Sequence, residues 1–298
     1  MIEAVVMGRV GIDLYPNQIE TPLREVRTYT RFVGGFAGNV ATGLARLGVR
    51  TAIVSRVGDE GHGEFVRAWL AGEGVDVRFL RTDPDWLTPP TFCEVWPPDN
   101  FPLLFYRRPT APDWQLSPDD FDEEEVADAR LLYATGTGLA RSPSRETTLE
   151  ALRRHRGTTI FDLDWRPSLW DERDAYPELA ARAASSADIV IGNEQEVAAA
   201  RIHERPGLIV KRGERGATVF EEGPGGLAET DVPAYPVEVV NGLGAGDAFA
   251  AALGHGLVRG LSLVEAMRRG NVAGALVASQ LACSEAMPRL EDLEAALV

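Results

Sequence analysis

The chain has little lysine, cysteine or histidine, and each shortage excludes a kind of site. Lys211 is the only lysine among 30 basic residues, so the Gly-Lys-Ser/Thr phosphate-binding loop is excluded. Two cysteines cannot form a disulfide framework or a four-thiolate zinc site, and we interpret Cys93 and Cys283 as small hydrophobic residues. The four histidines are scattered and lack the spacing of metal ligands.

Long apolar runs and a secretory signal are also missing. No uninterrupted apolar stretch reaches the ~20 residues that a membrane helix needs. Residues 1–7 lack the basic region and the long apolar run of a secretory signal. We therefore expect a reduced, cytoplasmic protein with no membrane partner.

Basic residues are outnumbered by acidic ones, 30 to 45, which gives a formal net charge of -15. Such a charge argues against a nucleic-acid partner, because neutralising phosphates requires a basic surface. It does not exclude a small anionic ligand held by a few local arginines. The 298 residues, 45% apolar and 25% charged, have the composition of a globular protein with one large domain or two modest ones.

Short apolar strands alternate with glycine-bearing turns and amphipathic helices along most of the chain. This alternation predicts parallel crossovers, and hence a doubly wound, mostly parallel sheet with helices on both faces. We expect a single α/β domain over residues 1–298. The expected strands are 4–7, 51–55, 130–134, 158–163, 188–191 and 207–211, with helices at 39–47 and 63–70.

Two segments, roughly 12–32 and 89–110, interrupt this rhythm. Both are rich in Pro, Thr, Val and aromatic residues, and neither contains a helical pattern. We interpret them as β-structure outside the main sheet, serving as a lid or a dimer contact. The alternative is a pair of irregular surface loops.

The segment 240–253 contains three glycines at alternating positions, followed by an alanine-rich helical run. Glycines permit a tight turn with exposed amides, so the N–H groups of Gly244, Ala245 and Gly246 can hold phosphate oxygens at a helix N-terminus. Asp247 stands at the mouth of this anion site, where a carboxylate could accept the proton of an attacking hydroxyl. The alternative is a capped helix with an ordinary first-turn aspartate.

A second glycine turn opens another helix at Gly34 and Gly35. Paired glycines let a ligand approach the backbone closely, and the amide of Asn39 can both donate and accept hydrogen bonds. Asp13 lies upstream, beyond the first strand, where doubly wound sheets bind ligands. These residues suit the hydroxyl groups of a sugar, although Asp13 taken alone could be a solvated loop residue.

The segments 34–48 and 241–253 resemble the two signatures of the ribokinase-like (PfkB) carbohydrate kinase family. The resemblance implies transfer of the γ-phosphoryl group of ATP to a primary hydroxyl, with Asp247 as base and Mg²⁺ as cofactor. It further implies a water-mediated metal contact from Glu196 and a β lid, through which the chain could form a homodimer. The nucleotide contacts that it implies are Asn193, Lys211, Gly213, Gly216, Gly244, Gly246 and Asn271. Many members have Asp-Thr where this chain has Asn241-Gly242, so the resemblance does not decide whether this chain has a monovalent-cation site.

Two arginines narrow the expected substrate. Arg107 lies in the second lid segment and Arg166 follows a central strand. A planar guanidinium matches a carboxylate, and these positions resemble the carboxylate-binding arginines of the family's keto-deoxy sugar-acid kinases. A 5-dehydro-2-deoxy sugar acid is the first expectation and a 2-keto-3-deoxy acid the second. The alternative functions are a neutral-sugar or nucleoside kinase and a non-catalytic sensor. The alternative for the two arginines is that they only pair with nearby carboxylates.

Overall fold

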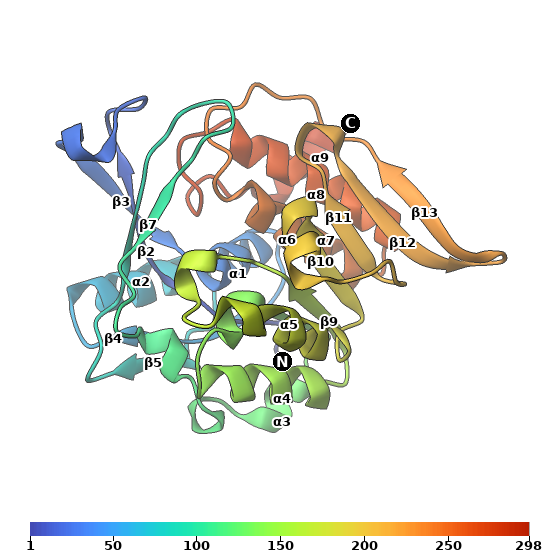
Figure 1. Cartoon of the computed structure of the whole chain (residues 1–298), viewed down its shortest axis with the longest axis horizontal. Helices are drawn as coiled ribbons and strands as arrows, with labels where there is room; N and C mark the ends of the chain where they lie inside the picture. Colours follow the sequence, from blue (N-terminus) through green and yellow to red (C-terminus); the bar gives the residue numbers. More distant parts are fainter. Residues whose placement is uncertain (298) are drawn as a thin grey trace.

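A computed structural model describes residues 1–297, which form two sheets (Figure 1). The larger sheet has nine strands in the order β13-β12-β11-β10-β9-β8-β1-β4-β5. Its strands are β1 (Ala4–Met7), β4 (Thr51–Gly58), β5 (Leu80–Asp83), β8 (Leu131–Thr135), β9 (Thr158–Asp162), β10 (Ile189–Asn193), β11 (Leu208–Lys211), β12 (Ala217–Gly223) and β13 (Gly226–Val232). The smaller sheet, here called the lid sheet, consists of β2 (Gly11–Pro16), β3 (Tyr29–Gly34), β6 (Pro90–Cys93) and β7 (Leu103–Phe105).

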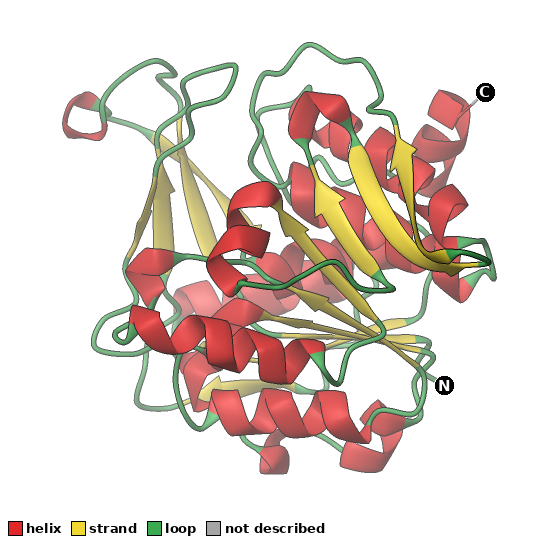
Figure 2. Cartoon of the chain, turned by 45° about the vertical axis from the view of Figure 1, so that its right-hand side comes forward, coloured by secondary structure: helices red, strands yellow, loops and turns green. Residues whose placement is uncertain are grey.

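Helices cover both faces of the larger sheet (Figure 2). They are α1 (Phe36–Arg46), α2 (Gly61–Gly72), α3 (Glu123–Ala127), α4 (Ser144–Arg154), α5 (Tyr176–Ala184), α6 (Glu194–Ala200), α7 (Ala245–Val258), α8 (Leu263–Ala278) and α9 (Leu290–Leu297). The sheet has one hydrophobic core on each face, because successive side chains of a strand point to opposite faces. Strand β1 illustrates this. Ala4 and Val6 pack in the core that contains α1 and α7, whereas Val5 and Met7 pack in the core that contains α4 and α5.

The pairing within the larger sheet is mostly parallel. Strands β5, β4, β1, β8, β9, β10 and β11 run parallel, and β12 and β13 add an antiparallel edge. From β1 the chain first adds β4 and β5 on one side, then returns to add β8 and its successors on the other. The reversal between β1 and β8 creates a crevice at the carboxyl ends of the strands, where such sheets bind ligands.

The predicted fold class is confirmed, and its boundaries are corrected in detail. Helix α1 begins three residues before the expected Asn39, because Gly35 adopts a φ of 87° and acts as the N-cap. Strand β4 extends to Gly58. The sequence analysis missed strand β5 and the β12–β13 hairpin.

The lid sheet lies within the two segments that interrupt the α/β rhythm. Strands β2 and β3 pair antiparallel, β2 and β6 parallel, and β6 and β7 antiparallel. Tyr15, Phe32, Cys93 and Val95 are buried in a cluster with Cys283, which belongs to the chain between α8 and α9. The lid sheet is therefore attached to the segment that adjoins the N-terminus of α7.

A buried ion pair links the segment after the lid sheet to the loop that follows strand β1. The guanidinium of Arg107, directly after β7, pairs with the carboxylate of Asp113, and both side chains are 3% exposed. The same carboxylate accepts a hydrogen bond of 3.2 Å from the backbone N–H of Val10. Arg107 also lies over the ring of Trp114, with 4.6 Å from Cζ to the ring centroid. The ion pair thus fixes the loop after β1 through the backbone N–H of Val10.

Replacing Arg107 should destabilise the protein, because the substitution leaves the Asp113 carboxylate buried without its cation. We expect Arg107→Met to lower the free energy of unfolding by about 3–5 kcal/mol. Urea denaturation followed by circular dichroism measures this change.

The adjacent Arg108 provides the matched control. Its side chain is 74% exposed and its ion pair with Asp171 spans 3.7 Å. Arg108→Met should therefore change the free energy of unfolding by less than about 0.5 kcal/mol. Equal losses in the two variants would contradict a specific role for the buried pair.

Candidate active site

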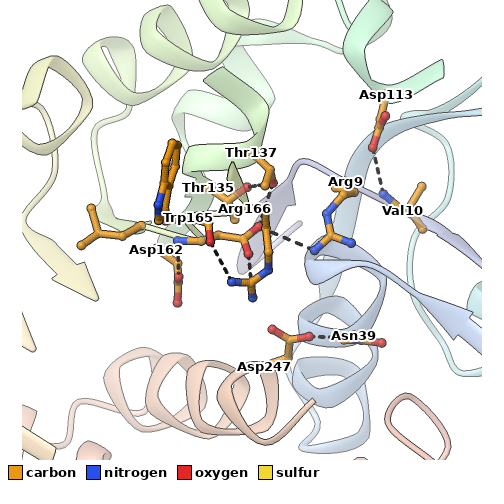
Figure 3. Close-up of polar contacts among 12 residues, drawn as sticks. Arg9, Val10, Asn39, Asp113, Thr135, Thr137, Asp162, Trp165, Arg166 and Asp247 are labelled. Atoms are coloured by element: carbon orange, nitrogen blue, oxygen red, sulfur yellow. Dashed lines mark hydrogen bonds and ion pairs between the residues drawn. The ribbon is translucent and has the colours of Figure 1, made fainter. Parts of the chain in front are cut away.

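Charged side chains gather at the carboxyl edge of the larger sheet, on the loops that follow adjacent strands (Figure 3). Each parallel strand ends at this edge, so residues distant in sequence meet there. The carboxylates are Asp13, Asp162, Asp164, Glu196 and Asp247, and the cations are Arg9, Arg166 and Lys211. Five carboxylates against three cations leave this cluster with a negative balance.

Asp247 lies in the first turn of α7 and is held by a residue from α1. Its Oδ2 accepts a hydrogen bond of 2.7 Å from the side-chain amide of Asn39 (Figure 3). Gly244, the N-cap of α7, has a φ of 82°, and a β-carbon there would lie 2.4 Å from Cβ of Cys283. Only glycine fits this turn, which presents the first amides of α7 beside Asp247.

Burial raises the pKa of the Asp247 carboxyl to about 6, and the nearby Asp164 carboxylate adds to the increase. The hydrogen bond from Asn39 and the charges of Arg9 and Lys211 act in the opposite direction. A carboxylate with this pKa is ionised near neutral pH and can still accept a proton.

Asp13 faces the same cluster from strand β2. A β-carbon at Gly34 would lie 2.1 Å from the Cγ atom of Asp13, so the second glycine turn leaves room for this carboxylate. Burial raises the pKa of Asp13 to about 6, against the charge of Arg9. The Sγ of Cys283 lies 3.6 Å from Asp13 Oδ2 and 3.7 Å from Asn39 Oδ1. Cys283 is buried, as the sequence suggested, but it contacts the polar cluster as well as the apolar one.

Arg166 lies between two carboxylates. Its guanidinium makes ion pairs of 3.1 Å with Asp164 and 3.1 Å with Glu196, and these charges hold its pKa above the usual value despite burial. Asp164 has a φ of 33° and accepts a hydrogen bond of 2.7 Å from Thr137. A non-glycine residue in this backbone region is typical of functional sites.

Lys211 is the last residue of β11 and approaches the N-terminus of α7. Its Nζ makes an ion pair of 3.1 Å with Asp162, and it lies 3.4 Å from where a β-carbon of Gly246 would stand. Burial raises the pKa of Asp162 to about 6 in spite of this pair, and the Asp162 charge raises the pKa of Lys211. The only lysine therefore lies beside the exposed amides of α7.

The other residues expected to contact the nucleotide lie on β10, α6 and α8 and in the turn after β11. Asn193 and Glu196 cap α6 reciprocally, with backbone-to-side-chain distances of 2.9 and 2.8 Å. Gly213 and Gly216 flank an exposed turn after β11, both with positive φ. Asn271 donates hydrogen bonds of 3.1 Å to the carbonyl of Val232 and 2.8 Å to that of Pro233, which fixes the chain after β13.

The structure does not bring Arg107 into this cluster. Its guanidinium is engaged with Asp113 and Trp114 behind the loop, so the expectation that Arg107 binds a substrate carboxylate finds no support in this arrangement. Sequence analysis missed Arg9, whose Nη2 lies 3.7 Å from Asp164 Oδ2. Arg9 follows β1 at the carboxyl edge, a position that could have marked it.

Within residues 1–297, no three His, Cys, Asp or Glu side chains come together in a group that could hold a metal ion. No helix among these residues has both the length and the apolar character to cross a membrane. The charged cluster is therefore not a preformed metal centre made by side chains alone.

Comparisons with known proteins agree with this geometry. The family model described as pfkB family carbohydrate kinase matches residues 1–290. Two curated relatives are named 5-dehydro-2-deoxygluconokinase. The one from Geobacillus thermodenitrificans is 33% identical, covering 98% of this chain and 92% of its own length. The one from Bacillus subtilis is 32% identical, covering 98% and 94%.

Solved structures show the same fold. An uncharacterized sugar kinase from Pyrococcus horikoshii in complex with ATP has a TM-score of 0.86 and 28% identity, covering 97% of this chain and 96% of that chain. Aminoimidazole riboside kinase from Salmonella enterica has a TM-score of 0.83 and 28% identity, covering 99% and 100%. This chain belongs to the pfkB family of carbohydrate kinases. It is a phosphotransferase that acts on a sugar hydroxyl.

The pH dependence of activity should report the hydrogen bond between Asn39 and Asp247. We expect Asp247 to act as a general base, which must be ionised, so kcat/KM should rise with pH through about 6. Asn39→Ala removes a donor that favours the ionised carboxylate, and we expect the acid limb of the profile to move to higher pH.

Thr42→Ala is the control, because Thr42 lies on the same helix and donates only to the carbonyl of Gly38. Its acid limb should coincide with that of the wild type. An unchanged acid limb in Asn39→Ala would show that the hydrogen bond does not set the ionisation of the base.

Proposed function

We propose that the protein transfers the γ-phosphoryl group of ATP to the primary hydroxyl of 5-dehydro-2-deoxygluconate. The observation that carries this proposal is the position of Asp247, bonded to Asn39 beside the exposed amides of α7 and Lys211. The names of the curated relatives support the sugar acid. The alternative acceptor with the same chemistry is 2-keto-3-deoxygluconate.

The reaction requires a base, an anion site and a leaving group. The Asp247 carboxylate accepts the hydroxyl proton while the substrate oxygen forms a bond to the γ-phosphorus. The bond from that phosphorus to the β–γ bridging oxygen breaks, and ADP leaves with the electron pair. The N–H groups of Gly244, Ala245 and Gly246 bind the charge on the transferred group, and Lys211 adds a positive charge nearby.

The acceptor is held on the lid side of Asp247. Asp13, whose carboxylate occupies the space that Gly34 leaves, accepts hydrogen bonds from sugar hydroxyls, and Asn39 fixes the carboxylate of Asp247. Gly35 allows the close approach of the loop that carries Arg9, because a β-carbon there would lie 2.6 Å from the Arg9 carbonyl oxygen. Arg166 contributes positive charge toward the acid substrate.

The negative balance of the cluster fits a divalent cation that arrives with the nucleotide. Mg²⁺ commonly keeps several waters and is bound by phosphates with one or two carboxylates. Glu196 is 5% exposed, and its carboxylate lies in the cluster, where it contacts Arg166. It could therefore hold such an ion through water. When bound, the ion would supply charge neutralisation between the phosphates.

The remaining residues are assigned to binding of the nucleotide: Asn193, Gly213, Gly216 and Asn271.

Replacing the base should abolish most turnover without unfolding the protein. Asp247→Asn keeps the shape of the side chain but cannot accept the hydroxyl proton, so kcat should fall about 100- to 10,000-fold. ATP binding, measured by isothermal titration, should persist. Asp128→Asn, a substitution at an exposed carboxylate that pairs with Arg156, should retain full activity. Turnover near the wild-type rate in Asp247→Asn would exclude Asp247 as the base.

A panel of acceptors in an ADP-release assay tests the substrate. We expect the highest kcat/KM with 5-dehydro-2-deoxygluconate, followed by 2-keto-3-deoxygluconate, and low values with fructose, ribose and nucleosides. Preference for a neutral acceptor would refute the sugar-acid assignment. Ligand binding without ADP release would indicate a sensor instead of a kinase.

A further inference from the structure

Two arginines in the charged cluster differ in how fully their donors are used. The guanidinium of Arg166 makes two ion pairs of 3.1 Å, and its Nη1 also donates to the carbonyl of Trp165 at 3.1 Å. Arg9 makes one ion pair of 3.7 Å to Asp164, which exceeds the length of a hydrogen bond. Arg166 is therefore largely saturated by protein groups, whereas Arg9 is not.

The Nε of Arg9 is buried and has no hydrogen-bond partner among residues 1–297. A buried polar group without a partner is costly, and its presence at a site is explained when a ligand supplies the missing acceptor. The Arg9 side chain is 12% exposed, so it lines the site without being freely solvated.

Arg9 is placed between the reacting end of the site and the lid sheet. Figure 3 shows its guanidinium and that of Arg166 on the same side of the Asp247–Asn39 pair. The Cζ of Arg9 lies 5.5 Å from the ring centroid of Phe105 in β7. Its charge also lowers the pKa values of Asp13 and Asp247, which places it within electrostatic reach of both.

The charge balance explains why a sugar acid needs such a group. The five carboxylates of the cluster would repel a sixth that entered with the substrate. A guanidinium with unused donors offsets this repulsion and can bind a carboxylate through two parallel hydrogen bonds. Arg107 also has a buried Nε without a partner among residues 1–297, but its guanidinium is paired with Asp113 and its side chain is only 3% exposed, so a ligand reaches it less readily than Arg9.

We infer that Arg9 binds the carboxylate of the sugar-acid substrate and selects for acids over neutral sugars. This inference rests on the proposed function, and it assigns to Arg9 the role that the sequence suggested for Arg107. The main chain of Arg9 is anchored independently, because its carbonyl accepts a hydrogen bond of 2.9 Å from Ala37 N–H. Changing the side chain should therefore leave the fold intact.

The test compares two acceptors that differ only in charge: 5-dehydro-2-deoxygluconate and its C1 amide. Arg9→Gln should raise KM for the acid about 10- to 100-fold, because a charge-assisted contact is lost. At about pH 8, above the acid limb set by Asp247, KM for the amide, KM for ATP and kcat should each change less than about threefold. Arg9→Lys keeps the charge but loses the planar fork, so it should restore part of the affinity for the acid.

Arg108→Gln is the matched control, because Arg108 also has a single ion pair of 3.7 Å but is exposed. It should leave both KM values unchanged. If Arg9→Gln raises KM equally for the acid and the amide, or raises neither, the proposed role of Arg9 is overturned. Turnover of the acid by the wild type would still uphold the proposed function in that case. Failure of the wild type to phosphorylate the acid would overturn both.

Discussion

The hydrogen bond between Asn39 and Asp247 joins two helix N-termini that lie 208 positions apart in the chain. Each helix follows a glycine turn, and α1 and α7 pack in the same core on one face of the larger sheet. Because this packing brings the two turns together, Asp13 and Asp247 face a common space. The rest of the site is arranged around this contact.

Burial and charge are balanced at the site in a way that suits reaction with anions. Asp13, Asp162 and Asp247 all have pKa values raised to about 6 by burial. Arg9, Arg166 and Lys211 offset part of the negative charge, and each is placed differently relative to the carboxylates. The cations of the site are thus gathered at the edge of the sheet, although the whole chain is acidic.

Much of the fold and several site residues could be predicted because local rules determine them. The alternation of strands and helices predicted the parallel sheet, and the glycine turn before Asp247 predicted a helix N-terminus there. Strand β13 escaped prediction because its residues are largely exposed and carry no strong alternation, and β12 because its buried run is only four residues long. Arg9 was missed although it follows the first strand at the carboxyl edge, because its residue type alone does not separate it from 28 other arginines.

The sequence by itself determined the fold class, the two glycine turns and the identity of the candidate base, since each depends on residue types at short spacing. Only the tertiary structure decided which arginines lie among the carboxylates at the edge of the sheet. Arg107 is paired with Asp113 and only 3% exposed, whereas Arg9 projects toward Asp164 and is 12% exposed; the Nε of each is buried without a partner among residues 1–297. That choice depends on which strand ends adjoin one another in the sheet, and strand order is a long-range property that local patterns do not encode.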